Sequence, residues 1–148
     1  MYRAARRDDA EAIAAFQEAM ARETEGLALD GPTVRRGVRA VFDDPAKGVY
    51  HVAEEGGKVV ASLLVTYEWS DWRDGVVWWI QSVYVAPEAR GRKVYSGLYA
   101  SVKKQAWEDP KVRGLRLYVD NRNASARKVY EALGMDGGHY AVFEAMKG

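Results

Sequence analysis

The sequence of 148 residues contains no cysteine. This absence excludes disulfide bonds, thiolate zinc sites and cysteine nucleophiles. The two histidines, His51 and His139, lie far apart with no cluster of other metal ligands around them, so we expect no metal site. No run of about 18 apolar residues occurs, and we therefore predict no contact with a membrane. Charges interrupt residues 1–16, where a secretion signal needs an apolar stretch, so we expect a cytoplasmic protein.

Neither sign of charge is in excess. Lys and Arg number 22 and Asp and Glu number 21, which gives a formal net charge of +1. A protein that binds nucleic acid usually has a basic excess, so we expect no nucleic-acid partner. The hydrophobic and charged fractions, 48% and 29%, are typical of a globular domain. The length suits a single domain over residues 1–148.

The spacing of apolar residues predicts an α/β fold with a mixed sheet. A short first strand over residues 2–4 precedes two helices, one from Asp8 or Asp9 to about Arg22 and one from Gly31 to Asp43. Two hairpins and an almost continuously apolar strand follow, and helices then alternate with strands. The predicted order is β-α-α-β-β-β-α-β-α-β, in which the last eight elements are expected at Gly31–Asp43, Val49–Glu54, Val59–Trp69, Val76–Val85, Val94–Trp107, Gly114–Val119, Ala124–Leu133 and Tyr140–Met146.

One candidate site is the segment from Gln81 to Tyr95, in which a buried strand leads through a basic loop into a helix. The first N–H groups of a helix lack internal partners and lie at the positive end of its dipole, which suits phosphate oxygens. Arg90, Arg92 and Lys93 add positive charge at the same place. The alternative is a solvated connection between strand and helix. A nucleoside-triphosphate loop would end in Gly-Lys-Ser/Thr, which is absent, and only Gly91 matches the three glycines of the dinucleotide pattern.

A second candidate site is the segment from Val119 to Met135. Asn123 follows a predicted strand, where its amide could cap the next helix or bind a ligand. Tyr130 lies seven residues further on, on the helix face of Ala126 and Val129. Taken alone, it reads as a core tyrosine whose hydroxyl is satisfied locally.

Together, the V-x-V-x-P strand end, the arginine- and glycine-rich loop and the N-x-x-A-x-x-x-Y-E-x-L-G-M segment resemble the GCN5-related N-acetyltransferase (GNAT) superfamily. The resemblance covers Val49 to the C-terminus and agrees with the order of the first two helices. It implies a sheet splayed between the fourth and fifth strands, with acetyl-CoA bound in the opening. The residues it implies for the cofactor are Val83, Tyr84 and Val85 at the pantetheine arm, Arg90, Gly91, Arg92, Lys93, Val94 and Tyr95 at the pyrophosphate, and Asn123 and Ala126 at the arm. Tyr130 would stand near the sulfur and protonate the departing thiolate.

The loop departs from the family pattern Gln/Arg-x-x-Gly-x-Gly/Ala at its two small positions, which are Lys93 and Tyr95 here. A glycine lets the backbone approach a phosphate without a Cβ in the way. In one reading Lys93 keeps ordinary helical dihedrals with its charge outward, and Tyr95 packs away from the cofactor. In the other, coenzyme A binds weakly or not at all.

The general base and the acceptor site are less defined by the sequence. Many relatives use a glutamate on the fourth strand, but residues 76–81 contain no acid, so Glu68 on the preceding strand becomes the candidate base. The alternative for Glu68 is an exposed carboxylate at the end of a strand, which is the more common case for a glutamate. Gln81 interrupts an apolar strand and is expected to have a specific partner. Acidic side chains around the expected acceptor mouth would suit a cationic amine, although exposed acids are common. Alternation places Trp78 and Trp79 on opposite faces of the sheet, so that one serves the core and the other lines the acceptor cleft. The partner of Gln81 is either structural or the substrate. The acceptor-side residues predicted are Glu23 and Glu25, placed after the first helix, with Trp78 and Gln81.

Three hypotheses follow. The first is an acetyl-CoA-dependent N-acetyltransferase, without a metal, that acts on a primary amine of a small molecule or a protein. The second is a non-catalytic acyl-CoA-binding or interaction module with a degenerate phosphate loop. The third is a homodimer with a structural role, formed through the tryptophan-rich hairpin.

Overall fold

The computed structural model describes residues 1–148 as two units, Met1–Arg116 and Leu117–Gly148. The first unit holds a five-stranded sheet in the order β1-β2-β3-β4-β5, in which neighbouring strands are antiparallel except for the parallel pair β4 and β5. The strands are β1 (Tyr2–Ala4), β2 (Val49–Glu55), β3 (Lys58–Ser70), β4 (Gly75–Val85) and β5 (Val112–Arg116). The predicted α/β fold is confirmed, and the single domain over residues 1–148 stays a prediction.

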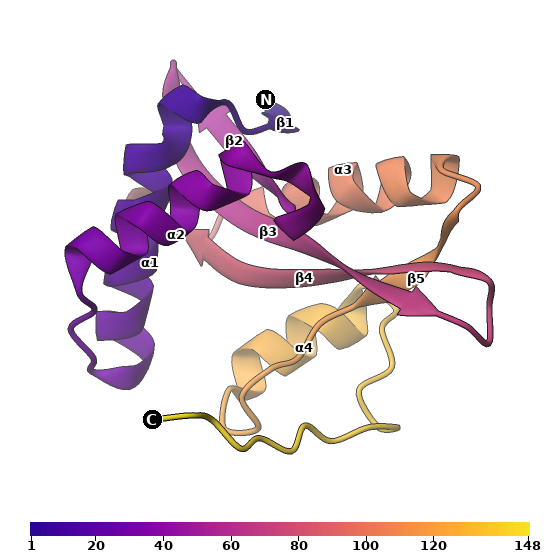
Figure 1. Ribbon diagram of the computed structural model, residues 1–148. Coiled ribbons are helices and arrows are strands. Elements are labelled where there is room, and N and C mark those ends of the chain that lie inside the picture. Colours follow the sequence, from indigo (N-terminus) through magenta and orange to yellow (C-terminus); the bar gives the residue numbers. More distant parts are fainter. The chain divides into compact units, whose positions relative to one another are not determined.

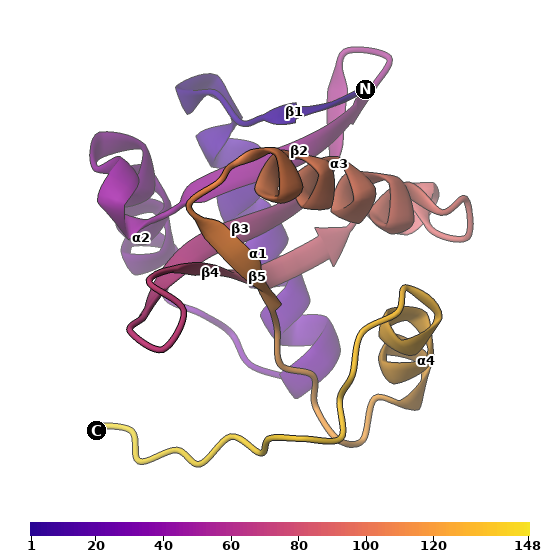
Figure 2. The same cartoon turned by 90° about the vertical axis from the view of Figure 1, so that its right-hand side faces the viewer.

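Three helices cover this sheet (Figures 1 and 2). Helices α1 (Ala10–Glu25) and α2 (Gly31–Asp43) lie on one face, and α3 (Val94–Glu108) lies on the other. The fully buried side chains of Ile13, Leu63 and Leu98 come from α1, β3 and α3. Burial of these apolar side chains holds the two layers of helices to the sheet. None of the helices has the length and apolar character needed to cross a membrane.

Helix α1 is longer than its apolar pattern predicts. It continues past Arg22 to Glu25 and ends at Gly26, whose φ of 63° is left-handed and whose N–H donates to the carbonyl of Arg22 at 3.1 Å. The polar residues of the last turn are exposed but compatible with a helix, so the glycine, and not the loss of apolar spacing, sets the end. Glu23 and Glu25 therefore belong to the last turn of α1, and the prediction that they follow the helix is wrong.

Strand β4 contains a bulge. Ser62 pairs with Tyr84 and Leu64 pairs with Gln81, so two residues of β4 face one residue of β3. Ser82, one of these two, has a φ of 54°. A bulge of this kind bends its strand and changes which face the following side chains occupy.

The sheet opens beyond the middle of β4. Pairing between β4 and β5 covers residues 76–79 of β4, and residues 80–85 have no partner strand on that side. The splay between the fourth and fifth strands is thus present. Strand β5 is shifted from the predicted Gly114–Val119 to Val112–Arg116.

The second unit contains one helix, α4 (Ala124–Ala132), which confirms the predicted helix to within one residue. Gly134, with a φ of 85°, follows its end. The predicted strand Tyr140–Met146 is absent, since residues 135–148 form neither helix nor strand. The apolar side chains of this segment are exposed, Phe143 by 95%, and a strand without a partner or burial is not stable.

Candidate active site

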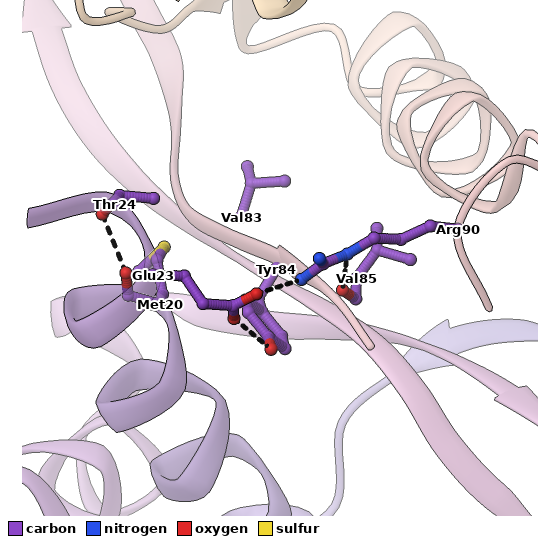
Figure 3. Close-up of a pocket in the computed structure, with 7 residues that line it drawn as sticks. All are labelled: Met20, Glu23, Thr24, Val83, Tyr84, Val85 and Arg90. Carbon is purple, nitrogen blue, oxygen red and sulfur yellow. Dashed lines mark hydrogen bonds and ion pairs between the residues drawn. The ribbon is translucent and has the colours of Figure 1, made fainter. Parts of the chain in front are cut away.

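A cavity of about 410 Å³ lies against the unpaired end of β4 (Figure 3). Its walls come from the last turns of α1, from the end of β4 beyond the bulge, and from the loop that leads to α3. The lining residues are Met20, Glu23, Thr24, Val83, Tyr84, Val85 and Arg90. All three β4 residues expected to meet the cofactor arm are therefore in one wall, together with the arginine that starts the basic loop.

The carboxylate of Glu23 joins two other residues of this wall. The hydroxyl of Tyr84 donates to its Oε2 at 2.5 Å, and Nη2 of Arg90 donates to its Oε1 at 2.9 Å (Figure 3). These two bonds, that of Tyr84 first, lower the pKa of Glu23. Burial and the nearby carboxylate raise the pKa of the Tyr84 phenol. At neutral pH, the cluster therefore holds an ionised glutamate, a neutral tyrosine and a charged arginine.

The loop before α3 has an unusual backbone. Gly91 has a φ of 79°, and Lys93 has φ 60° and ψ 28°, both in the left-handed region. The expectation that Lys93 keeps helical dihedrals is wrong, because the chain must turn at this position to enter α3. The exposed side chain of Lys93 carries its charge outward as expected. No hydrogen bond joins the amides of Gly91, Arg92, Lys93 or Val94 to another group of the protein. Such a row of amides at a helix start suits an anion.

The two bulky residues at the small positions leave these amides open. The ring of Tyr95 packs against that of buried Tyr99, with centroids 6.3 Å apart. Arg92 is turned back onto Glu55, to which it donates at 2.8 and 3.1 Å. Lys93, by contrast, makes no ion pair and can supply charge to a ligand. The loop therefore combines amides without a protein partner and one lysine outside any ion pair, despite its departure from the glycine pattern.

Glu68 lies on β3, outside the lining of the cavity. Its Oε1 accepts from Nε1 of Trp79 at 2.9 Å and from Nη1 of Arg116 at 2.7 Å. These bonds lower the pKa of Glu68, the indole bond more than the guanidinium bond. Gln81 has the specific partner that its position in an apolar strand predicts, because its Nε2 donates to Oγ1 of Thr66 at 2.6 Å.

The two neighbouring tryptophans of β4 lie on opposite faces of the sheet. Trp79 shares its face with Glu68, Gln81 and, beyond the bulge, Tyr84. Trp78, which we predicted on the acceptor side, lies on the other face, with its ring edge against Tyr67 at 6.3 Å between centroids. Of these two tryptophans, Trp79 therefore shares the face of Tyr84, which lines the cavity. The contact of Trp78 with an acceptor stays a prediction.

The remaining predicted residues lie in other places. Glu25 is exposed at the end of α1 and does not line the cavity. Asn123 caps α4, since its Oδ1 accepts from the amide of Ala126 at 3.0 Å. Tyr130 is half-buried on α4. The contacts of Asn123, Ala126 and Tyr130 with a cofactor stay predictions.

Comparison with known proteins decides the family. A family model described as the acetyltransferase (GNAT) family matches residues 10–135. The chain belongs to this family. GNAT proteins are acetyltransferases that use acetyl-CoA, and the cavity beside the splayed β4 is therefore the candidate site for this co-substrate. The structure brings together no three His, Asp or Glu side chains that could hold a metal.

Solved structures agree with this assignment. A possible acetyltransferase from Clostridium difficile 630 is 42% identical, with a TM-score of 0.93 over 99% of this chain and 97% of that chain. Two others share the fold at low identity. A predicted acetyltransferase from Clostridium acetobutylicum, solved with acetyl-CoA, is 18% identical with a TM-score of 0.75 over 97% and 95% of the two chains. A ribosomal-protein-alanine N-acetyltransferase from Brucella melitensis biovar Abortus 2308 is 16% identical with a TM-score of 0.80 over 100% and 99%. No curated protein matches the chain.

Proposed function

We propose that the protein is an N-acetyltransferase that transfers the acetyl group of acetyl-CoA directly to a primary amine of a small molecule or a protein. The observation that carries the proposal is the cavity at the unpaired end of β4, which adjoins a row of open amides at the start of α3. An elongated ligand with a diphosphate at one end and an uncharged arm at the other matches this combination of surfaces.

The co-substrate would be held mainly by backbone groups. The amides of residues 91–94 would bind the diphosphate, and the side chain of Lys93 would add one positive charge. The peptide groups of residues 83–85 would bind the pantetheine arm, and Asn123 and Ala126 stay expected contacts of the same arm. When bound, acetyl-CoA supplies the acetyl group as a thioester.

Three groups of the chain would then serve the transfer. A peptide N–H near Tyr84 would polarise the carbonyl oxygen as it gains charge. Glu68 would accept the proton of the attacking amine through a water, since it is the one carboxylate of β3 and β4 on the face of Trp79 and Gln81. The phenol of Tyr130 would hold the proton that the departing thiolate takes up. The absence of cysteine fits a transfer without a covalent enzyme intermediate.

One observation favours a second candidate, an acyl-CoA-binding module without turnover. Strand β4 has no carboxylate, and Glu68 is already bound by Arg116 and Trp79. A carboxylate held in this way is a weaker base than a free one, because its pKa lies further from neutral pH. This module would bind coenzyme A and leave amines unchanged.

Calorimetry with CoA and acetyl-CoA, followed by thiol detection with a panel of primary amines, separates these functions. The enzyme binds both ligands and releases CoA with at least one amine, and its Tyr130→Phe variant keeps its affinity for CoA while its rate falls. Binding of CoA without thiol release from any amine supports the module instead. If no heat of binding is seen at millimolar CoA, the protein is neither the enzyme nor the CoA-binding module.

A further inference from the structure

The side chain of Arg90 is held at three points. Its Nε donates to the carbonyl of Val85 at 2.9 Å, its Nη2 donates to Glu23 at 2.9 Å, and its guanidinium carbon lies 5.4 Å from the centre of the Tyr84 ring. The residue that provides the charged partner, Glu23, comes from the last turn of α1. Contacts from α1 therefore reach the first residue of the phosphate loop (Figure 3).

These contacts fix the direction in which Arg90 extends. The guanidinium is folded back onto the end of β4, and Gly91, whose open amide begins the row, is the next residue along the chain. About half of the Arg90 side chain is exposed, so without a partner it would move through several rotamers. An arginine anchored on β4 leaves the row of amides uncovered and restrains the peptide that leads into it.

The charge of the cluster also matters at this site. A free carboxylate beside a diphosphate would repel it, whereas the ion pair with Arg90 neutralises Glu23. The pKa of Glu23 is lowered, so the pair is present throughout the neutral range. The carboxylate is thus occupied by Tyr84 and Arg90, which argues against its predicted role as an anion that receives the amine.

We propose that Glu23 is a positioning residue for the phosphate loop, which acts by holding the guanidinium of Arg90 on the carbonyl of Val85. The inference rests on the proposed function, because it concerns the same co-substrate. In this role Glu23 acts through Arg90, and not through a contact with the acceptor.

Calorimetric titration with CoA tests this role, independently of turnover. In Glu23→Gln, the amide oxygen can still accept from Tyr84, but the charge that holds Arg90 is gone. The Arg90 side chain would then be mobile and would have to be ordered again on binding, which should lower the affinity for CoA by about tenfold. Tyr84→Phe removes only the hydroxyl and should weaken CoA about threefold. Glu11→Gln is the matched control, because Glu11 also lies on α1 and pairs with an arginine, Arg39, at 2.8 Å. Its affinity for CoA should equal that of the wild type.

A double variant shows whether Glu23 acts through Arg90. If it does, Glu23→Gln combined with Arg90→Gln binds CoA no more weakly than Arg90→Gln alone. The inference is overturned if the losses of CoA affinity in the two single variants add up in the double variant, or if Glu23→Gln binds CoA as the wild type does. A higher KM for the amine with an unchanged Kd for CoA in Glu23→Gln also overturns it. If these results are obtained while the wild-type protein still binds CoA, only the role of Glu23 is refuted, and the proposed function stands. If the wild-type protein itself does not bind CoA, the proposed function is refuted.

Discussion

The carbonyl oxygen of Lys93 accepts the N–H of Gly97 at 3.1 Å, and this bond starts α3 from a lysine with left-handed backbone. Such a conformation costs a residue with a Cβ about 1 kcal/mol. The family pattern has a glycine at this position, which adopts the same conformation without that cost. The structure thus keeps the backbone of the glycine loop while replacing its glycine, and gains one unpaired positive charge.

Replacing Lys93 with glycine should raise stability and lower affinity for CoA. We expect Lys93→Gly to increase the free energy of unfolding by up to about 1 kcal/mol, because the left-handed strain is relieved. The lost charge should weaken CoA about threefold. Lys93→Ala is the control that removes the charge and keeps the strain. It should lower the affinity for CoA as much as Lys93→Gly does, without a gain in stability. Urea unfolding and calorimetry measure both effects, and equal stabilities of the two variants would refute the strain argument.

Replacing Glu68 with glutamine tests the proposed base. Glutamine can still accept from the Trp79 indole, so the fold should be retained, while kcat/KM at pH 7 should fall by about 100-fold or more. The pKa of Glu68 lies below its usual 4.5, so Glu68 is ionised throughout the assay range. A rise of wild-type kcat/KM between pH 6 and 9 should therefore reflect deprotonation of the substrate amine, whose pKa is about 10. Glu11→Gln should keep the wild-type rate. A Glu68→Gln enzyme with more than a third of that rate would assign the proton transfer elsewhere.

The sequence predicted most elements of the first unit but not the face on which Tyr84 lies. The run of apolar residues in β4 identifies a central strand. It contains no alternation of apolar and polar residues from which the bulge at Ser82 could be recognised. Without the bulge, Tyr84 would share the face of Trp78. With it, Tyr84 shares the face of Trp79 and Gln81 and reaches Glu23.

Contacts between distant residues were also beyond the sequence. Glu23 and Arg90 are 67 residues apart, and their meeting depends on where α1 ends and how it lies on the sheet. The loop motif, by contrast, is local, so spacing alone located its amides at the start of α3. Residues 140–146 show the reverse case, in which a strand-like pattern was present but the apolar side chains found no burial.

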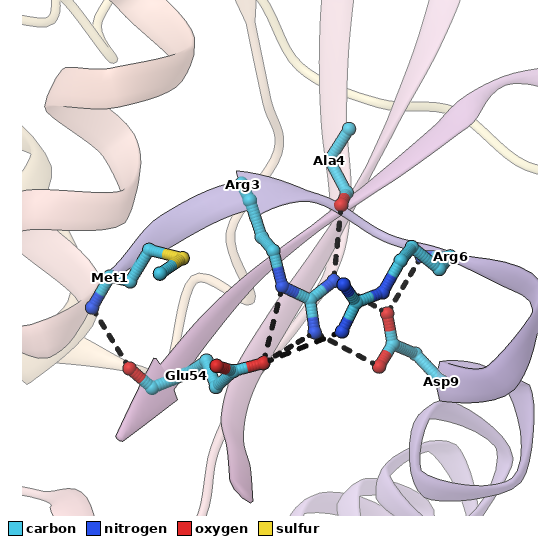
Figure 4. Close-up of polar contacts among 6 residues, drawn as sticks. All are labelled: Met1, Arg3, Ala4, Arg6, Asp9 and Glu54. Atoms are coloured by element: carbon cyan, nitrogen blue, oxygen red, sulfur yellow. Dashed lines mark hydrogen bonds and ion pairs between the residues drawn. The ribbon is translucent and has the colours of Figure 1, made fainter. Parts of the chain in front are cut away.

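A cluster of charges joins the start of the chain to the sheet (Figure 4). Arg3 of β1 donates to Asp9 at 2.8 Å and to Glu54 of β2 at 2.7 Å, and its side chain is only 15% exposed. Asp9 also accepts from the amide of Arg6 at 2.7 Å, which fixes the turn before α1. The bond from Arg3 is the main cause that lowers the pKa of Asp9.

Because of this cluster, the free energy of unfolding should decrease at low pH. Because the pKa of Asp9 is below 3.8 in the folded protein, the unfolded chain binds the proton first as the pH falls. The stabilisation is complete above about pH 5 and is lost as the pH falls through the folded pKa. Asp9→Asn should cost about 3 kcal/mol at pH 7 and much less at pH 2. Asp43→Asn, which breaks an exposed pair with Arg7, should cost less than about 1 kcal/mol. Urea unfolding at several pH values measures the difference, and a constant cost for Asp9→Asn would exclude this linkage.

Two glycines should respond oppositely to a methyl group. At Gly48, which precedes β2 with a φ of 147°, a Cβ would lie 2.5 Å from the carbonyl oxygen of Val65. That oxygen belongs to β3 in the middle of the sheet and cannot move aside, so Gly48→Ala should cost about 3 kcal/mol. At Gly37, inside α2, a Cβ would meet no atom within 4 Å. Alanine favours a helix over glycine by about 1 kcal/mol, so Gly37→Ala should stabilise the protein. Thermal unfolding of the two variants gives the comparison, and a Gly48→Ala protein as stable as the wild type would show that β2 and β3 can separate at this point.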